Sequence, residues 1–379
     1  MSRPVVTWFA NNHEHSLHYA KFGLMAMARA GEIRFLECPN ATASADLLPE
    51  AVRCHQHRRT VAVRITHGAS SRLVILDGED SIFQTSPLIE HCDLYFSCSY
   101  RRKFFEGAPF DLTLPWQTDC ELAHYQKKYT DLQNQFGTHL CKGRAFVPIG
   151  PNLEWERPNG FFKAKTLALR HRLSQLRAPW IDWGVQCDRF ERRWAHLHTL
   201  RSQQPVHDVV LKDSLWGWPR HRVALHRQLA ELSADFSIRA ELHYRVAAPC
   251  ELGTHPAPDP ADFPMTTGGG VTGDYESLLA ASRLGVFATG FHYGCRNIVT
   301  LSWFLGLRTL VDPPSFEAIY DFTEVGARPH ISGSWAELPT ELRAAREETP
   351  NTRRARQQRF DEVASPSCAA RHLIEQALA

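Results

Sequence analysis

The chain has 379 residues, more than one ordinary hydrophobic core accommodates, so two domains are expected. Hydrophobic residues make up 43% and charged residues 22%, a balance that excludes intrinsic disorder. The formal net charge of +2 supplies no global field for nucleic acid, and no uninterrupted apolar run approaches the ~20 residues of a membrane-spanning helix.

The ten cysteines are scattered, without a C-x-x-C pair or the Cys/His spacing of a zinc site. The first residues form a strand and a polar turn instead of a basic, apolar leader. We therefore expect reduced thiols in a cytoplasmic protein, with neither a metal nor a resident cofactor.

The N-terminal part alternates strand and helix patterns. Strand Pro4–Ala10, helix Leu17–Ala30 and strand Glu32–Cys38 form a βαβ opening, which is typical of a parallel sheet. Further strands are predicted at 60–65, 72–76, 93–97 and 145–149, with a helix around Pro87–Cys92. We assign residues 1–150 to an N-terminal α/β domain.

The pattern changes between residues 151 and 204, where Pro and Trp are frequent and a helix is predicted at 162–176. We interpret this stretch as a helical connector. Its tryptophans, Trp155, Trp180 and Trp183, either form a sugar-binding platform or pack in a core.

A second α/β pattern covers residues 205–340. Its strands are predicted at 207–211, 237–244, 284–289 and 308–312, and its helices at 220–232, 274–282 and from about 296. Short apolar strands bounded by Gly or Pro are typical of parallel strands covered on both faces. Helices follow over 341–379, and the predicted fold is α/β with two Rossmann-like domains and a C-terminal helical segment.

One loop in this second pattern predicts an anion site. Gly290 and Gly294 flank a loop that follows a buried strand and leads into a helix beginning near Arg296 and Asn297. A helix N-terminus at the carboxyl end of a parallel strand favours a bound phosphate. The alternative is an ordinary glycine-containing turn beside a solvated arginine.

The order of features over 270–313 resembles the donor-binding half of GT-B glycosyltransferases that use nucleotide sugars. The segments that carry the resemblance are Gly270-Val271, the helix with Tyr275-Glu276-Ser277-Leu278-Leu279, the strand and loop 284–290, and the helix, Gly306 and strand of 298–311. The resemblance implies a nucleotide-diphosphate sugar as donor substrate, no metal, and a glycan or lipid-linked acceptor. It also implies a role in surface polysaccharide or lipopolysaccharide synthesis.

One departure concerns the mechanism. Many retaining members place a Glu near the middle of the second helix, where this chain has Leu301 and Ser302. The retaining mechanism of that subgroup is therefore not expected.

The resemblance also implies which residues contact the donor. The loop Gly290–Asn297 would contact the diphosphate, Lys212 would lie opposite it with Arg220 or Arg222, and Glu317 would contact the ribose. For any single Lys or Arg, the alternative is an exposed surface residue.

An inverting reaction needs a general base for the acceptor hydroxyl. Asp77 and Asp80, in a DGED segment after a strand, are the first candidates, and His13 in the loop after the first strand is the next. Acidic residues at such positions often serve only as caps or turn formers. The DGED spacing is not a DxD metal motif.

Three alternatives remain open. The patch Arg101–Lys103, followed by Phe104-Phe105, is either a peripheral contact for the inner face of a membrane or a solvated turn. The enzyme could be an epimerase of the same architecture. A non-catalytic GT-B-like protein, including one that binds nucleic acid through 343–359, is the rival from another class, although no nucleic-acid partner is expected.

Overall fold

The computed structural model describes residues 3–11, 14–54, 59–154, 182–215, 218–244, 259–330 and 332–379. The chain forms two compact units. The first consists of Met1–Gly107, Gln135–Leu197 and Ala364–Ala379, and the second of Ala108–Asn134 and His198–Val363. Residues 108–134 thus join the second unit, although the sequence placed them in the N-terminal domain, and the last residues return to the first. The predicted two-part α/β fold with a C-terminal helical segment is confirmed.

The sheet of the first unit is mixed. It has the order β2-β1-β3-β4-β5-β6, and β3 runs antiparallel to both of its neighbours. Its strands are β1 (Val5–Ala10), β2 (Arg34–Pro39), β3 (Thr60–His67), β4 (Ser70–Asp77), β5 (Leu94–Ser97) and β6 (Gly143–Ala145). The predicted βαβ opening is confirmed, because β1 and β2 are parallel and helix α1 (His18–Arg29) connects them. A tight turn at Gly68, with φ 59°, reverses the chain between β3 and β4. The last predicted strand, 145–149, ends already at Ala145.

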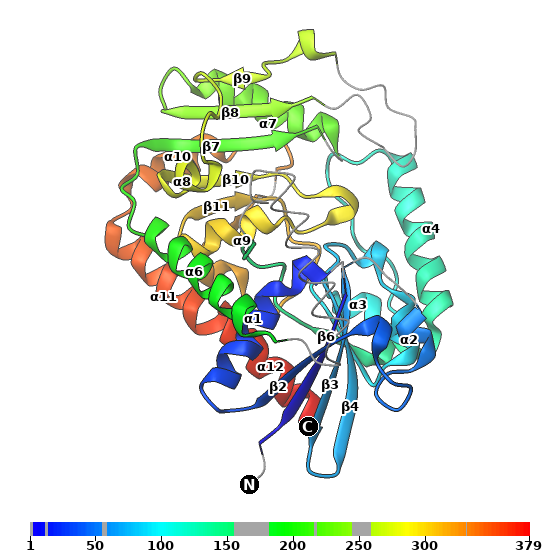
Figure 1. Ribbon diagram of the computed structural model, residues 1–379. Coiled ribbons are helices and arrows are strands. Elements are labelled where there is room, and N and C mark those ends of the chain that lie inside the picture. The colour runs from blue at the N-terminus through cyan, green and yellow to red at the C-terminus, as the bar shows by residue number, and fades with distance from the viewer. Residues whose placement is uncertain are drawn as a thin grey trace, which may run out of the picture. The chain divides into compact units, whose positions relative to one another are not determined.

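Two helices far apart in sequence pack closely in the first unit. Helix α12 (Pro366–Leu378) lies against α1, as Figure 1 shows. A Cβ at Gly23 would lie 1.9 Å from the carbonyl oxygen of Pro366, so only glycine fits this crossing. Among the described residues, the other helices that lie mostly in this unit are α2 (Glu50–Cys54), α3 (Arg102–Phe105) and α6 (Gly184–Leu200). The predicted helix at Pro87–Cys92 is a 3-10 helix, Pro87–His91.

The second unit contains a Rossmann-like sheet. Its strands are β7 (His207–Ser214), β8 (Ile238–His243), β9 (Thr266–Thr267), β10 (Ser282–Phe287), β11 (Arg308–Val311) and β12 (Ala327–Pro329). They lie in the order β12-β11-β10-β7-β8-β9, and all pairs except β8–β9 are parallel (Figure 1). If β7 is numbered as the first strand, the order from β9 to β12 is 3-2-1-4-5-6, which is the strand order of a Rossmann fold. The strand order therefore reverses between β7 and β10, and the carboxyl ends of both strands open on the same edge.

The helices that contact the strands of this sheet include α7 (Pro219–Leu232), α8 (Tyr275–Ala280), α9 (Asn297–Phe304) and α10 (Leu338–Glu347). Helix α11 (Pro350–Ala364) and most of α4 (Asp119–Phe136) also belong to this unit. No helix in the described ranges is both long and apolar enough to cross a membrane. No disulfide bond joins any of the described cysteines.

The arginine-rich stretch 343–359 is packed onto the second unit. Arg353 donates hydrogen bonds to the carbonyl oxygens of Leu305 and Ala280, at 3.0 and 2.7 Å. Arg356 donates to the carbonyl oxygen of Gly306 at 2.9 Å, and Arg346 pairs with Asp208 at 2.7 Å. These guanidinium groups hold helices α10 and α11 in place, which counts against a nucleic-acid-binding face here.

Candidate functional site

The carboxyl end of β10 is fixed from both sides in the second unit. The backbone N–H of Thr289 donates to Oδ2 of Asp312 at 2.6 Å, and its carbonyl oxygen accepts from Nη2 of Arg222 at 2.7 Å. Asp312 follows β11, whereas Arg222 lies in the first turns of α7. The strand exit nearest the switch point is thus held between a carboxylate and a guanidinium group.

A buried carboxylate and two arginines lie at the switch point itself. Nη1 of Arg222 is 2.6 Å from Oδ2 of Asp213, and Nη1 of Arg296 is 3.0 Å from Oδ1. Burial raises the pKa of Asp213, but the two positive charges outweigh it and bring the pKa down to about 2. The three ionised side chains together carry one net positive charge, which favours an anionic ligand.

Arg296 has hydrogen-bonding capacity to spare. Its Nη1 is shielded from solvent and makes no hydrogen bond to the described residues, because its contact with Asp213 lacks hydrogen-bond geometry. Both ring nitrogens of His226 are likewise buried and make no hydrogen bond to the described residues. Burial lowers the pKa of His226 to about 4, so the ring is neutral at pH 7. Unpaired buried polar atoms are rare, and a ligand or ordered water commonly satisfies them.

A cavity of about 30 Å³, well below the ~300 Å³ of a typical ligand pocket, lies beside Arg296 at the ends of β10 and β11. Gly294 and Arg296, both predicted from the sequence, line this pocket together with Thr289, Cys295 and Asp312. The remaining lining residues are Phe287, Ala288, Val299, Trp303, Val311, Pro314 and Phe316. The polar side of the pocket thus lies at the first turn of α9, where the helix dipole favours negative charge.

The predicted anion loop is closed on itself. The backbone N–H of Gly290 donates to the carbonyl oxygen of Gly294 at 2.8 Å, so it does not point to a ligand. His292 and Tyr293 adopt left-handed conformations, with φ 53° and 65°. A Cβ at Gly290 would lie 2.6 Å from the carbonyl oxygen of Gly294. Gly290 thus shapes the loop, and its predicted contact with phosphate stays a prediction.

Aromatic residues outside the loop hold this shape. Tyr125, from the 108–134 segment, packs edge-on against Tyr293 at 5.0 Å, and its hydroxyl lies 3.1 Å from Nδ1 of His292. Nε1 of Trp218 donates to the carbonyl oxygen of Gly290 at 3.1 Å. The sequence did not predict these contacts, because Tyr125 lies more than a hundred residues before the loop.

The second unit also contains a cluster of two histidines and an aspartate. Nε2 of His221 lies 2.8 Å from Oδ1 of Asp312, and Nε2 of His330 contacts the same oxygen. Trp116 stacks on His221 with ring centroids 3.6 Å apart, and Trp335 packs against both histidines. The sequence reasoning missed these residues, although Asp213 and Asp312 each end a buried apolar strand run (VVLKD and TLVDPP), the same signal that singled out Asp77.

Four other predicted donor-binding residues do not line the pocket. Lys212 and Arg220 are exposed, as is Asn297, the first residue of α9, and Glu317 is partly buried. None of these four is among the residues that line the described pocket. Of the two arginines that the sequence left as alternatives, Arg222 lies at the switch point. Contacts of the other four with a donor remain predictions.

In the first unit, the candidate base Asp77 is buried, and both of its carboxylate oxygens accept hydrogen bonds from the protein. Its side chain is 1% exposed, Oδ1 accepts the N–H of Glu79 at 2.9 Å, and Oδ2 accepts the hydroxyl of Tyr95. Burial raises the pKa of Asp77 to about 6. Asp80 is more accessible and pairs with Arg59 at 3.4 Å, which makes it the more open of the two candidates. His13 lies outside the described residues.

The first unit contains a buried charge cluster. Nζ of Lys21 lies 2.6 Å from Oε1 of Glu14 and 2.7 Å from Oε1 of Glu37. Nε1 of Trp8 donates to Oε2 of Glu14 at 2.9 Å. All four side chains are buried, so this cluster joins β1, β2 and α1 in the core of the first unit.

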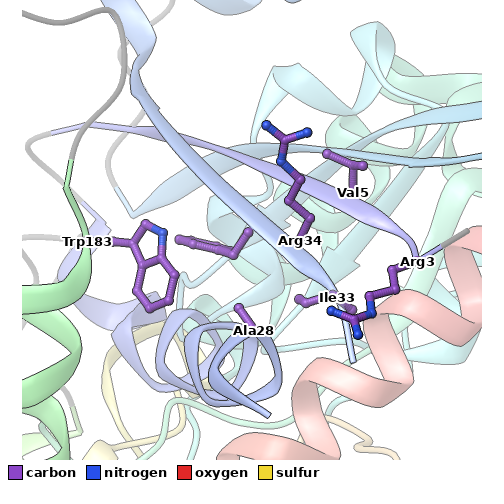
Figure 2. Close-up of a pocket in the computed structure, with 7 residues that line it drawn as sticks. Arg3, Val5, Ala28, Ile33, Arg34 and Trp183 are labelled. Carbon is purple, nitrogen blue, oxygen red and sulfur yellow. The ribbon is translucent and has the colours of Figure 1, made fainter. Parts of the chain in front are cut away.

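Trp183 lines a separate hollow of about 530 Å³ in the first unit (Figure 2). Its indole packs edge-on against Phe35 at 5.6 Å. Figure 2 shows Trp183 at one side of the hollow and Arg3 at the other, with Arg34 between them on β2. Trp155 and Trp180, the other predicted platform residues, lie outside the described residues.

The basic patch at 101–103 does not present an apolar face. Phe104 and Phe105, which would insert into a membrane, are buried, and Phe105 stacks with Tyr100 at 4.9 Å. This arrangement counts against the membrane contact, and the patch lies at the start of helix α3 instead of in a turn.

No known protein-family profile matches the chain, and no curated protein matches its sequence. Function is therefore inferred from the geometry of the second unit.

Proposed function

We propose that the protein is a GT-B type glycosyltransferase whose second unit binds the nucleotide-diphosphate sugar. The observation that carries this proposal is Arg296, whose buried Nη1 makes no hydrogen bond to the described residues at the switch point of a Rossmann-ordered sheet. Nucleotides bind to such sheets at the carboxyl ends of the strands where the order reverses. The resemblance over 270–313 supports a sugar nucleotide as the ligand.

Glycosyl transfer from a nucleotide-diphosphate sugar requires the protein to stabilise the departing nucleoside diphosphate. When the bond between the sugar and the diphosphate breaks, negative charge grows on the diphosphate oxygens. Arg296 and the N-terminus of α9 supply positive potential beside the pocket, and Asp213 holds the guanidinium group in place. Neutralisation of this charge by fixed groups lowers the barrier without a proton transfer to the leaving group.

The sequence of helix α9 bears on whether the sugar is transferred with inversion or retention of configuration. Its sequence NIVTLSWF contains no acidic residue, and Leu301 and Ser302 are buried. The proposal therefore favours inversion, in which a carboxylate takes the proton of the acceptor hydroxyl as that oxygen attacks the anomeric carbon. Asp80 is the candidate for this base that the sequence predicted and that remains accessible.

The first test is nucleotide binding. UDP, GDP, ADP and CDP are added separately, and at least one is expected to raise the melting temperature, whereas the matching nucleoside is not. A ligand at 100 times its dissociation constant stabilises the folded state by ~2.7 kcal/mol. If no common nucleoside diphosphate raises the melting temperature, the proposal is wrong.

The second test locates the site. Arg296→Gln is expected to abolish the shift, whereas Arg227→Gln, which removes the same charge from an exposed position of α7, is expected to retain it. Equal loss or equal retention in both variants would contradict the assignment to Arg296.

The third test concerns the reaction. With the nucleotide identified, its sugar conjugates are incubated with the protein, and release of the nucleoside diphosphate is followed. If the wild-type protein releases the nucleoside diphosphate and the Arg296→Gln variant does not, glycosyl transfer is supported. Conversion of the sugar without release identifies an epimerase, and binding without either reaction identifies a non-catalytic protein.

A further inference from the structure

Three metal-ligating atoms converge in the core of the second unit. Nε2 of His221, Nε2 of His330 and a carboxylate oxygen of Asp312 all lie within 4.8 Å of one another. The three residues are 2%, 2% and 4% exposed. Such a group is uncommon in a core, because each buried polar side chain needs a partner.

The sheet itself brings two of these residues together. Val311 of β11 pairs with Pro329 of β12 in parallel register, so Asp312 and His330 leave adjacent strands at the same level. The N–H of His330 continues the ladder to the carbonyl oxygen of Val311 at 2.9 Å. His221 reaches them from the first turn of α7, which makes three independent elements converge on one point.

We propose that His221, Asp312 and His330 bind a divalent transition metal ion, with zinc as the expected metal. Two imidazole nitrogens and one carboxylate oxygen form a ligand set that zinc accepts, leaving a fourth position open. Zinc takes these ligands at about 2.0–2.2 Å, and small side-chain adjustments suffice because the three atoms already face one another.

The surroundings of the carboxylate fit this role. Oδ2 of Asp312 is occupied by the N–H of Thr289 at 2.6 Å, which orients the group and leaves Oδ1 to face the two histidines. Among the residues that the structure describes, no lysine or arginine forms an ion pair with Asp312. A buried carboxylate needs a balancing charge, and a metal ion would supply it.

The histidines are equally suited. Nδ1 of His221 and Nδ1 of His330 are buried and make no hydrogen bond within the described residues. In the structure, Nε2 of each ring donates a hydrogen bond to the carboxylate of Asp312. Metal binding would require that proton to move to Nδ1, which has no competing partner among the described residues. Trp116 and Trp335 hold the ring planes, with Trp335 at 4.3 Å from His330.

The site borders the proposed nucleotide pocket, since Asp312 lines that pocket together with Arg296. The metal site does not depend on nucleotide binding. Its three ligands, their burial and their orientation would be the same if the pocket bound another molecule.

The test measures metal directly on the whole chain, purified without a polyhistidine tag or chelator. Mass spectrometry of the metal content is expected to give one zinc per chain. After removal of the zinc, titration with Co²⁺ is expected to produce the visible absorption of four-coordinate cobalt. Both measurements use the unmodified protein, so neither depends on whether a variant folds.

Variants then assign the ligands. His330→Gln and Asp312→Asn keep some hydrogen-bonding capacity and are expected to lose the bound metal. His226→Gln is the matched control, because His226 is also buried on α7 but lies outside the cluster, and it is expected to retain the metal. A zinc-free protein without a cobalt spectrum would overturn the proposal and leave a hydrogen-bonded cluster. Binding that survives in both ligand variants would overturn it as well.

Discussion

The indole of Trp116 lies flat on the imidazole of His221, with ring centroids 3.6 Å apart and planes inclined by 2°. The stack attaches the 108–134 segment to the first turn of α7, at the edge of the sheet that bears the candidate site. Trp335 packs on His221 as well, at 4.7 Å and 22°. His221 is therefore fixed by aromatic rings in addition to its contact with Asp312.

Replacement of Trp116 by Ala should lower the free energy of unfolding. The variant loses the apolar area of the indole and the stack on His221, a loss of about 2 kcal/mol for a partly buried ring. Urea unfolding followed by circular dichroism measures the change. Trp116→Phe keeps a ring at this position and should recover much of the loss; equal destabilisation by both substitutions would contradict a stacking role.

The two carboxylates in the cluster of Lys21, Glu14 and Glu37 should contribute unequally to the stability of the fold. Burial raises the pKa of both, but Lys21 and His18 hold that of Glu14 well below its usual range, whereas the pKa of Glu37 remains raised. Glu37 thus takes up a proton more readily than Glu14. At neutral pH, Glu14→Gln should destabilise the protein more than Glu37→Gln.

Lys21→Met should be the most destabilising substitution in this cluster. It removes the cation between two buried carboxylates, and breaking a buried ion pair costs about 3–5 kcal/mol. Urea unfolding of the three single variants under one condition gives the ranking. A Lys21→Met variant as stable as Glu37→Gln would contradict the charge assignment.

Asp77 predicts a pH dependence of stability. Burial raises the folded-state pKa of Asp77 to about 6, above the ordinary aspartate value of 3.8. Between these two values the folded state binds more protons than the unfolded state, so stability falls as the pH rises. The difference of about two pKa units corresponds to about 3 kcal/mol. Asp77→Asn cannot ionise and should gain this amount relative to the wild type between about pH 4 and pH 7.

The control for this prediction is Asp80→Asn, which removes an accessible carboxylate from the same turn. Its stability relative to the wild type should change little over the same pH range. A difference between Asp77→Asn and wild type that does not vary with pH would show that Asp77 ionises normally.

The pair of Asp213 and Arg222 predicts strong non-additivity. Asp213→Asn leaves the buried guanidinium group of Arg222 without its carboxylate, and Arg222→Met leaves Asp213 with Arg296 alone. Each single change should cost about 3–5 kcal/mol. The double variant should be less destabilised than the sum of the two, because neither charge remains uncompensated. Additive losses in chemical unfolding would show that the two groups act independently.

The elements of the second unit were largely readable from local patterns. Apolar runs bounded by glycine placed β10, α9 and β11 within a few residues of their observed ends. The 18-residue helix α4 was missed, although its start carries a local signal. Thr118 and Glu121 form a reciprocal capping box, in which each side chain accepts the backbone N–H of the other.

For the candidate site, the sequence by itself determined the strand ends, the glycine-flanked loop and Arg296 at the start of α9, because strand and helix boundaries depend on neighbouring residues. Only the tertiary structure decided that Asp213 orients Arg296 and that His221, Asp312 and His330 meet. The last three are separated by 91 and 18 positions. Strand order and register bring them together, and both arise from packing between distant segments.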